Sequence, residues 1–165
     1  MTQLMLRHIA AGATLAALTA PLRADAQSRT VFETRGAFLA LSVADLDAST
    51  RWYSEKFGLS IVMHPPKQDK SAVTVLEGGG LIVELLQRDD ATPLRQAAPT
   101  ATASYLVHGF FKAGVIVDDL NATITALRAR GVEIAMGPFP ASKEQRANAI
   151  VRDNAGNLIQ FFGAR

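Results

Sequence analysis

The chain has 165 residues with nearly balanced charge, 17 Lys and Arg against 15 Asp and Glu, and it contains no cysteine. The absence of cysteine excludes thiolate metal sites and cysteine nucleophiles, because both need a thiol. The near balance of charge argues against a nucleic-acid partner, for which a basic patch or stripe is expected. The length is sufficient for one domain with a substantial core.

Residues 1–26 have the order of a secretory signal peptide. A short polar start carries one arginine, residues 9–20 are small and apolar, and an Ala-Asp-Ala cleavage pattern ends at Ala26. The apolar run is shorter than the about 20 residues that a membrane-spanning helix needs. We expect cleavage before Gln27, a periplasmic or secreted protein of residues 27–165, and no stable membrane anchor. The alternative is an N-terminus that is only amphipathic or disordered.

The first half of the expected mature chain predicts a strand, a helix and three more strands. Residues 36–43 alternate between two sets of side chains with a period of two, which is typical of a strand. Asp45 then begins a helix, because its side chain can accept hydrogen bonds from free backbone N–H groups, and Gly58 ends it. Three strand-like runs follow at residues 59–64, 72–77 and 81–87, and glycines 78–80 turn the chain between the last two.

A polar segment at residues 88–108, rich in Ala, Thr and Pro, is expected to link this half to a second one. The second half repeats the order of the first. It predicts a strand at 109–117, a helix that begins at Asp118 or Asp119 and ends at Gly131, a strand at 132–138, and a hairpin of residues 147–152 and 157–162.

Two segments of the chain have the same pattern 74 residues apart. Residues 38–46 (FLALSVADL) and 112–120 (KAGVIVDDL) are each a short apolar strand that runs into an acidic helix start. Both halves therefore read as β-α-β-β-β. The sequence predicts an α+β fold of two such modules, residues 36–87 and 109–163, that form a concave sheet cavity.

Each helix should cover one face of its sheet and leave the other face open. The open faces mix apolar and polar side chains, which suits a pocket for a small molecule. The predicted ligand-binding residues on these faces are Phe38, Ile82, Glu84, Lys112, Ile116, Gln160 and Phe162.

Four segments in the right order resemble the vicinal oxygen chelate superfamily, which includes glyoxalase I, extradiol dioxygenases and the fosfomycin- and bleomycin-resistance proteins. They are SVADLDASTRWYSEKFGLSIV, GLIVELL, VIVDDLNATITALRARGVEI and VRDNAGNLIQFF, and the resemblance covers about residues 36–163. It implies a glyoxalase-like fold of paired modules. Metal-dependent members take one ligand from the first strand and one from the last strand of each module, with His or Gln at the first places and mostly Glu at the last.

Carried onto this chain, these four places are Phe38, Glu84, Lys112 and Gln160. Only Glu84 is a usual ligand of a divalent cation, so we predict no catalytic metal and no cofactor, and the catalytic residues stay unknown.

We expect the Lys112 ammonium to take the vacated place and pair with Glu84, because a lone carboxylate in a half-buried cavity is costly. The pair would form within one chain or across a homodimer, since the family uses both arrangements. The alternatives are that Lys112 extends to solvent and that Glu84 lies on a solvated rim. Lys112 could also bind an anionic group of a ligand or act as an amine nucleophile.

Three functions are compatible with this sequence. The leading hypothesis is an exported protein that binds a small organic molecule in the sheet cavity without a catalytic metal, as bleomycin-resistance proteins bind without catalysis. The first alternative is a glyoxalase-like lyase or isomerase, either metal-dependent or using Lys112. The second alternative is a structural or interaction module without a ligand.

Overall fold

The structure, a computed structural model, describes residues 36–164 and forms two βαβββ modules. The first module contains β1 (Ala37–Ser42), α1 (Leu46–Trp52), a π-helical turn (Tyr53–Phe57), β2 (Ser60–Met63), β3 (Ser71–Gly78) and β4 (Leu81–Arg88). The second module contains β5 (Lys112–Val117), α3 (Leu120–Ala129), β6 (Glu133–Phe139), β7 (Asn148–Arg152) and β8 (Leu158–Gly163). The segment between the modules contains α2 (Leu94–Ala97) and a 3₁₀ turn (Ser104–Leu106). The predicted signal peptide lies outside the described residues.

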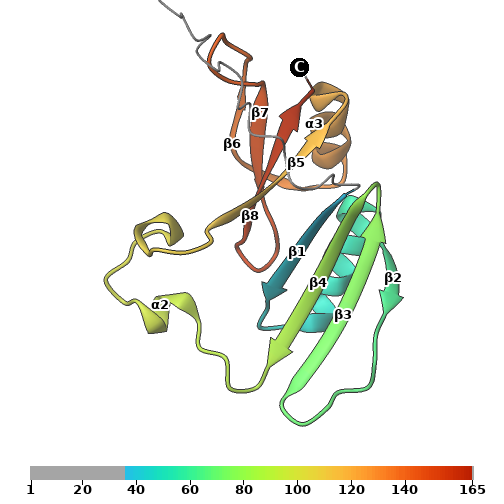
Figure 1. The fold of residues 1–165 in the computed structure, drawn as a ribbon, viewed down its shortest axis with the longest axis vertical. Helices are drawn as coiled ribbons and strands as arrows, with labels where there is room; N and C mark the ends of the chain where they lie inside the picture. The colour runs from blue at the N-terminus through green and yellow to red at the C-terminus, as the bar shows by residue number, and fades with distance from the viewer. Residues whose placement is uncertain (1–35, 165) are drawn as a thin grey trace, which may run out of the picture. The chain divides into compact units, whose positions relative to one another are not determined.

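Each module contains one four-stranded mixed sheet (Figure 1). The strand orders are β1-β4-β3-β2 and β5-β8-β7-β6. The first strand of each module runs parallel to the last, and the remaining neighbours are antiparallel. The predicted α+β fold with two βαβββ modules is thus confirmed.

Each helix begins at an aspartate in the matching place of the repeat. The Oδ1 atom of Asp45 accepts a hydrogen bond from Ala48 N at 2.8 Å, and that of Asp119 accepts one from Ala122 N at 2.9 Å. These bonds satisfy backbone donors that have no partner in the first turn. The choice between Asp118 and Asp119 is therefore resolved in favour of Asp119. No helix among residues 36–164 is both long and apolar enough to cross a membrane.

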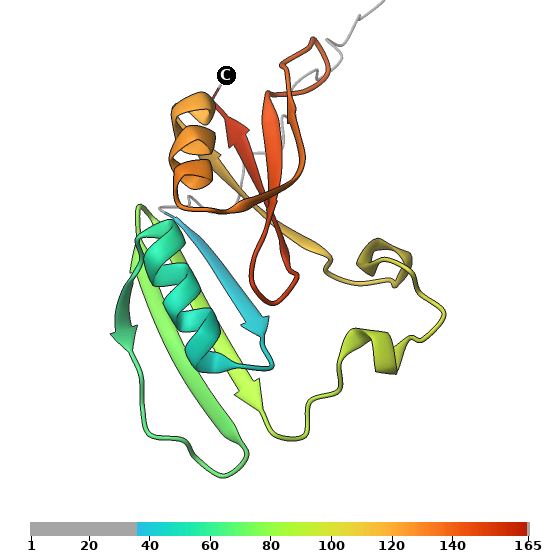
Figure 2. The ribbon, with the colours of Figure 1, turned by 180° about the vertical axis from the view of Figure 1, so that it is seen from behind.

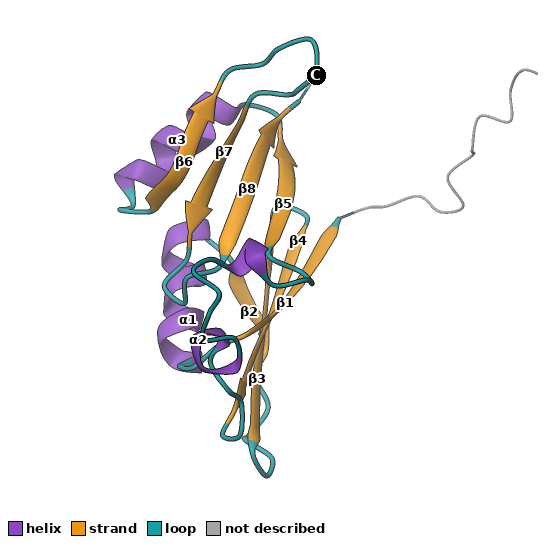
Figure 3. Cartoon of the chain, turned by 90° about the vertical axis from the view of Figure 1, so that its left-hand side faces the viewer, coloured by secondary structure: helices purple, strands orange, loops and turns teal. Residues whose placement is uncertain are grey.

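The helix of each module lies across one face of its own sheet, as Figures 2 and 3 show. Successive side chains of a strand point to opposite faces of the sheet, so every second residue faces the helix and the others lie on the open face. The strand residues on the helix side of each sheet are buried or half-buried: Leu39, Leu41, Val43, Val83 and Leu85 in the first module, and Val115, Val117, Ile159 and Phe161 in the second. Trp52, Phe57 and Val115 pack against both core clusters and so connect the two modules.

A buried hydrogen bond also joins the modules. Tyr53, which has no exposed surface, donates from its hydroxyl to Asp153 Oδ2 at 2.9 Å, across 100 positions of sequence. Asp153 begins the turn between β7 and β8, and it also accepts bonds from Ala155 N, Asn157 N and Asn157 Nδ2. Beside it, Asn154 Nδ2 donates to Ser49 Oγ at 3.2 Å. The hairpin turn of the second module is therefore fastened to the helix of the first.

Replacing Tyr53 by phenylalanine should reduce the free energy of unfolding by about 1–3 kcal/mol, because a buried carboxylate loses a donor that water cannot replace. The matched control is Tyr105→Phe, since Tyr105 is the other tyrosine of the chain and is 60% exposed. Urea denaturation of both variants measures the difference. Equal stability of the two variants would show that the Tyr53 hydroxyl does not stabilise the fold.

The same tyrosine should make stability depend on alkaline pH. Burial raises the pKa of the Tyr53 phenol far above its ordinary value, and the neighbouring Asp153 carboxylate raises it further. In the unfolded chain the phenol ionises at about pH 10. Above that pH the unfolded state releases a proton that the folded state keeps, so stability that is complete below about pH 10 is lost as the pH rises.

We therefore expect the urea midpoint of the parent chain to fall more steeply above about pH 10 than that of Tyr53→Phe. Equal slopes of urea midpoint against pH for the two chains in this range would show that the Tyr53 phenol does not cause the loss of stability.

Candidate functional site

The open face of the first sheet is mainly apolar and contains two carboxylates, Glu84 on β4 and Glu77 on β3, which pairs in register with Ile82. Phe38 pairs in register with Ile82, and Ala40 pairs with Glu84, so these residues of β1 and β4 share a face. The Phe38 side chain is 59% exposed, while Ile82 and Glu84 are half-buried. The structure thus brings together the three predicted binding residues of the first module, on a surface that is open in the single chain.

The open face of the second sheet contains the other four predicted residues. Register pairs Ile116 with Phe162 and Gly114 with Gln160, and Lys112 lies two positions along the same face of β5. Gly114 makes room for a ring here, because a Cβ at this position would lie 3.2 Å from the Phe162 ring. Ile116 is 63% exposed, so this face also presents apolar surface to solvent.

Gln160 is held by a buried hydrogen bond. Its Nε2 donates to Asn148 Oδ1 at 2.9 Å, and Asn148 Nδ2 donates to the Arg146 carbonyl at 3.0 Å. The amide is therefore oriented by β7 and not free to turn. An oriented amide suits recognition of a fixed polar group of a ligand.

The structure does not bring Lys112 and Glu84 into an ion pair within one chain, as judged over residues 36–164. The two residues belong to different sheets. The Lys112 Nζ atom lies 5.3 Å from the centroid of the Phe111 ring, a cation–π distance. The within-chain form of the predicted pair is thus absent among the described residues, and the pair across two copies stays a prediction.

The four places that hold metal in related proteins do not fit a divalent cation here. Phe38 has no donor atom, Lys112 has a positive charge, and Gln160, whose Nε2 donates to Asn148, can offer only one neutral amide oxygen. Glu84 alone cannot supply the three or four protein ligands of a transition-metal site. No group of three or more His, Asp or Glu residues within residues 36–164 is arranged to hold a metal ion elsewhere.

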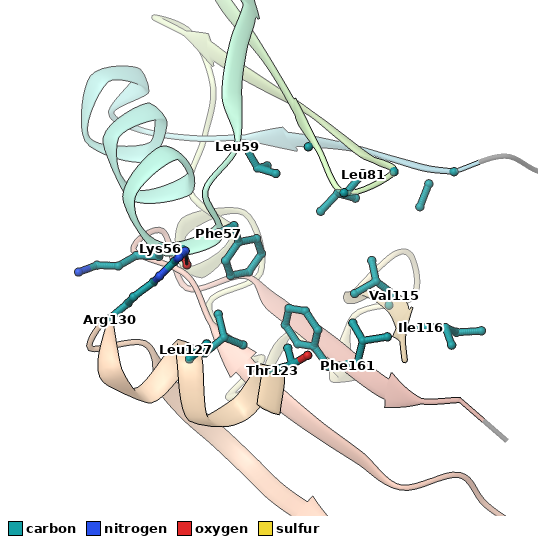
Figure 4. A pocket seen from close by; sticks show the side chains of 18 residues that line it. Lys56, Phe57, Leu59, Leu81, Val115, Ile116, Thr123, Leu127, Arg130 and Phe161 are labelled. Carbon is teal, nitrogen blue, oxygen red and sulfur yellow. Dashed lines mark hydrogen bonds between the residues drawn. The ribbon is translucent and has the colours of Figure 1, made fainter. Parts of the chain in front are cut away.

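A separate cavity of about 660 Å³ lies where the two modules adjoin (Figure 4). Of the seven predicted binding residues, Ile116 alone lines it. Its wall also contains Lys56, Thr123 and Arg130, which are not among the residues predicted from the sequence. Lys56 and Arg130 occupy matching places of the repeat, 74 residues apart, and this spacing could have identified them.

The sequence matches the glyoxalase/bleomycin resistance protein/dioxygenase superfamily over residues 36–161, and the chain belongs to this family. No curated protein matches the chain.

Several solved structures have a similar fold. One is a glyoxylase/bleomycin resistance protein/dioxygenase domain from Frankia sp. EAN1pec, with a TM-score of 0.61 and 19% identity over 78% of this chain and 90% of that one. Another is TnmS3, an antibiotic binding protein from Streptomyces sp. CB03234, with a TM-score of 0.56 and 16% identity over 83% and 99%. A mutant of glyoxalase I from Zea mays gives a TM-score of 0.58 and 20% identity over 79% of this chain and 45% of its own.

The four residues at the family's metal-ligand positions do not suit a divalent cation, which predicts that the protein binds no stoichiometric metal. The chain, purified without a histidine tag and incubated with Zn²⁺, Ni²⁺ or Mn²⁺, should retain no stoichiometric ion after desalting, because only Glu84 offers a charged oxygen at these places. Elemental analysis by mass spectrometry measures the content. A retained ion at one equivalent per chain that is lost in Glu84→Gln would show that these places do form a metal site.

Proposed function

We propose that this protein is an exported, metal-free binding protein of the family, and that a small organic molecule binds between open sheet faces from two copies of the chain. The observation that carries the proposal is the chemistry of the four family ligand places. They present an aromatic ring, a carboxylate, an ammonium group and an oriented amide. Such a set can bind the apolar body and fixed polar groups of an organic ligand, and it does not suit a transition metal.

Exposed apolar side chains support the pairing of two copies. Phe38 and Ile116 are more than half exposed, and Phe110 and Phe111 of the segment before β5 are exposed too. Burying these side chains against a second copy would remove their apolar surface from water. Glu84 on one open face and Lys112 on the other have opposite charges, so two copies related by a twofold axis could bury both faces and form two equivalent ion pairs.

Two further observations agree with this proposal. TnmS3, which shares the fold, is an antibiotic binding protein. The order of residues 1–26, typical of a secretory signal peptide, supports export.

Aromatic antibiotics and aromatic metabolites that carry no carboxylate should raise the melting temperature of the protein, because a ligand that binds only the folded state stabilises it, by about 2.7 kcal/mol at 100 times the Kd. Phe38→Ser should abolish the shift, since it removes the exposed ring of the first sheet face. Leu94→Ser is the control, because Leu94 is 48% exposed in α2, outside both sheet faces. A shift that survives Phe38→Ser would exclude binding at this face, and turnover of the ligand would show an enzyme in place of a binding protein.

The pairing of copies predicts a charge-swap result. Sedimentation equilibrium should show a dimer that Lys112→Glu or Glu84→Lys weakens by about tenfold or more, because each single change opposes two like charges. The double variant should recover most of the affinity. Lys143→Glu, an exposed change in the loop between β6 and β7, is the control for net charge. A monomeric parent chain, or single effects that simply add in the double variant, would exclude the ion pair across the dimer.

A further inference from the structure

The repeat creates two equivalent contacts between a helix and the hairpin turn of the other module, and one of them is filled. Residues 153–157 connect β7 to β8, and their Asp153 and Asn154 side chains bond to Tyr53 and Ser49. The aromatic rings of Tyr53 and Phe57 pack edge to face beside this turn. This contact is closed by side chains from both modules.

The equivalent contact is open. Thr123 and Leu127 of α3 stand 74 residues after Ser49 and Tyr53, and the turn near them connects β3 to β4. Because Gly78 already pairs with Leu81, this turn consists only of Gly79 and Gly80. A turn of two glycines provides no side chain to fill the space that a five-residue turn fills on the other side. The cavity of about 660 Å³ is what remains (Figure 4).

The charges in the wall of this cavity have one sign. Its charged lining residues are Lys56 and Arg130, and the rest of the wall is mainly apolar, with Phe57, Leu127 and Phe161 among its side chains. Arg130 Nη1 donates to the Lys56 carbonyl at 3.1 Å, which holds the guanidinium at the edge of the cavity. Within residues 36–164 neither cation forms an ion pair. Four of the five guanidinium N–H donors are thus unused by that bond.

We propose that this cavity, which shares only Gly114 and Ile116 with the open face of the second sheet, is a second binding site for a small molecule with an apolar body and a carboxylate. The apolar body packs against the wall between α3 and the glycine turn. The carboxylate accepts hydrogen bonds from the planar guanidinium of Arg130, which lies against the Lys56 carbonyl at the edge of the cavity. The volume lies in the range of pockets that hold drug-sized ligands, about 300–1,000 Å³.

The probe for this site is 2-naphthoate, and 2-naphthamide is its neutral counterpart of similar shape. Titration of the ¹⁵N-labelled full chain, followed by amide chemical shifts, should move the signals of Gly79, Gly80 and Thr123 and should leave those of the sheet-face residues Glu84 and Lys112 in place. The naphthamide should bind about tenfold more weakly or worse, because it lacks the charge that strengthens hydrogen bonds to Arg130. Equal affinity of the two probes, or shifts confined to the sheet faces, would overturn the proposal.

Two pairs of variants on α3 and at its C-terminal end test whether 2-naphthoate binds in this cavity. Ala126→Phe should fill the cavity and weaken 2-naphthoate binding about tenfold or more, whereas Ala129→Phe should not, because both alanines are exposed but only Ala126 lines the cavity. Arg130→Gln should likewise weaken binding, whereas Arg128→Gln should not, since Arg128 does not line it. Unchanged affinity in both Ala126→Phe and Arg130→Gln would overturn the proposal.

One more variant separates this site from the proposed function. Phe38→Ser removes a ring from the open sheet face and should leave the affinity for 2-naphthoate unchanged. Loss of 2-naphthoate binding in this variant would place the probe on the sheet face and would overturn the second site. That result would not contradict the proposed function.

Discussion

The buried bond between Tyr53 and Asp153 determines how the two modules are held together. The Asp153 carboxylate lies in the interior, where a charge without partners would be costly, and four donors satisfy it. Three of these donors come from its own turn and shape the hairpin, and the fourth comes from the helix of the other module. One side chain therefore fixes both a local turn and a long-range contact. The aromatic pair Phe57 and Phe161, with ring centroids 5.7 Å apart, packs across the same junction and gives it apolar area.

Local chemistry explains why the fold could be predicted from the sequence. The aspartate caps, the glycine ends of the helices and the period of two in the strands all act over a few residues. The long-range role of Asp153 could not be predicted in this way. Asp-Asn-Ala-Gly is common turn chemistry, and nothing near it in sequence indicates that a tyrosine 100 positions earlier donates to its carboxylate. The π-helical form of residues 53–57 was also missed, because sequence periodicity does not distinguish it from the end of an α-helix.

The candidate site could be predicted only in part, for a related reason. Strand register follows from the alternation of side chains, so the sequence placed Phe38 with Glu84 on one face and Lys112 with Gln160 on the other. Whether two such faces meet depends on how whole sheets are positioned, and a single sequence contains little information about that. Phe38 and Ile116 are exposed in a single chain. Their burial against a second copy or a ligand would therefore still contribute a favourable hydrophobic free energy.

Duplication followed by divergence can create a binding site without any dedicated loop. Two copies of one module give two equivalent junctions, and identical turns would have filled both. Here the turn of the second module has five residues, three of them with polar side chains, and that of the first has two glycines. The shorter turn costs the fold little, because the filled junction already holds the modules together through Tyr53 and Asp153. The open junction instead leaves an apolar space with the guanidinium of Arg130 at its edge.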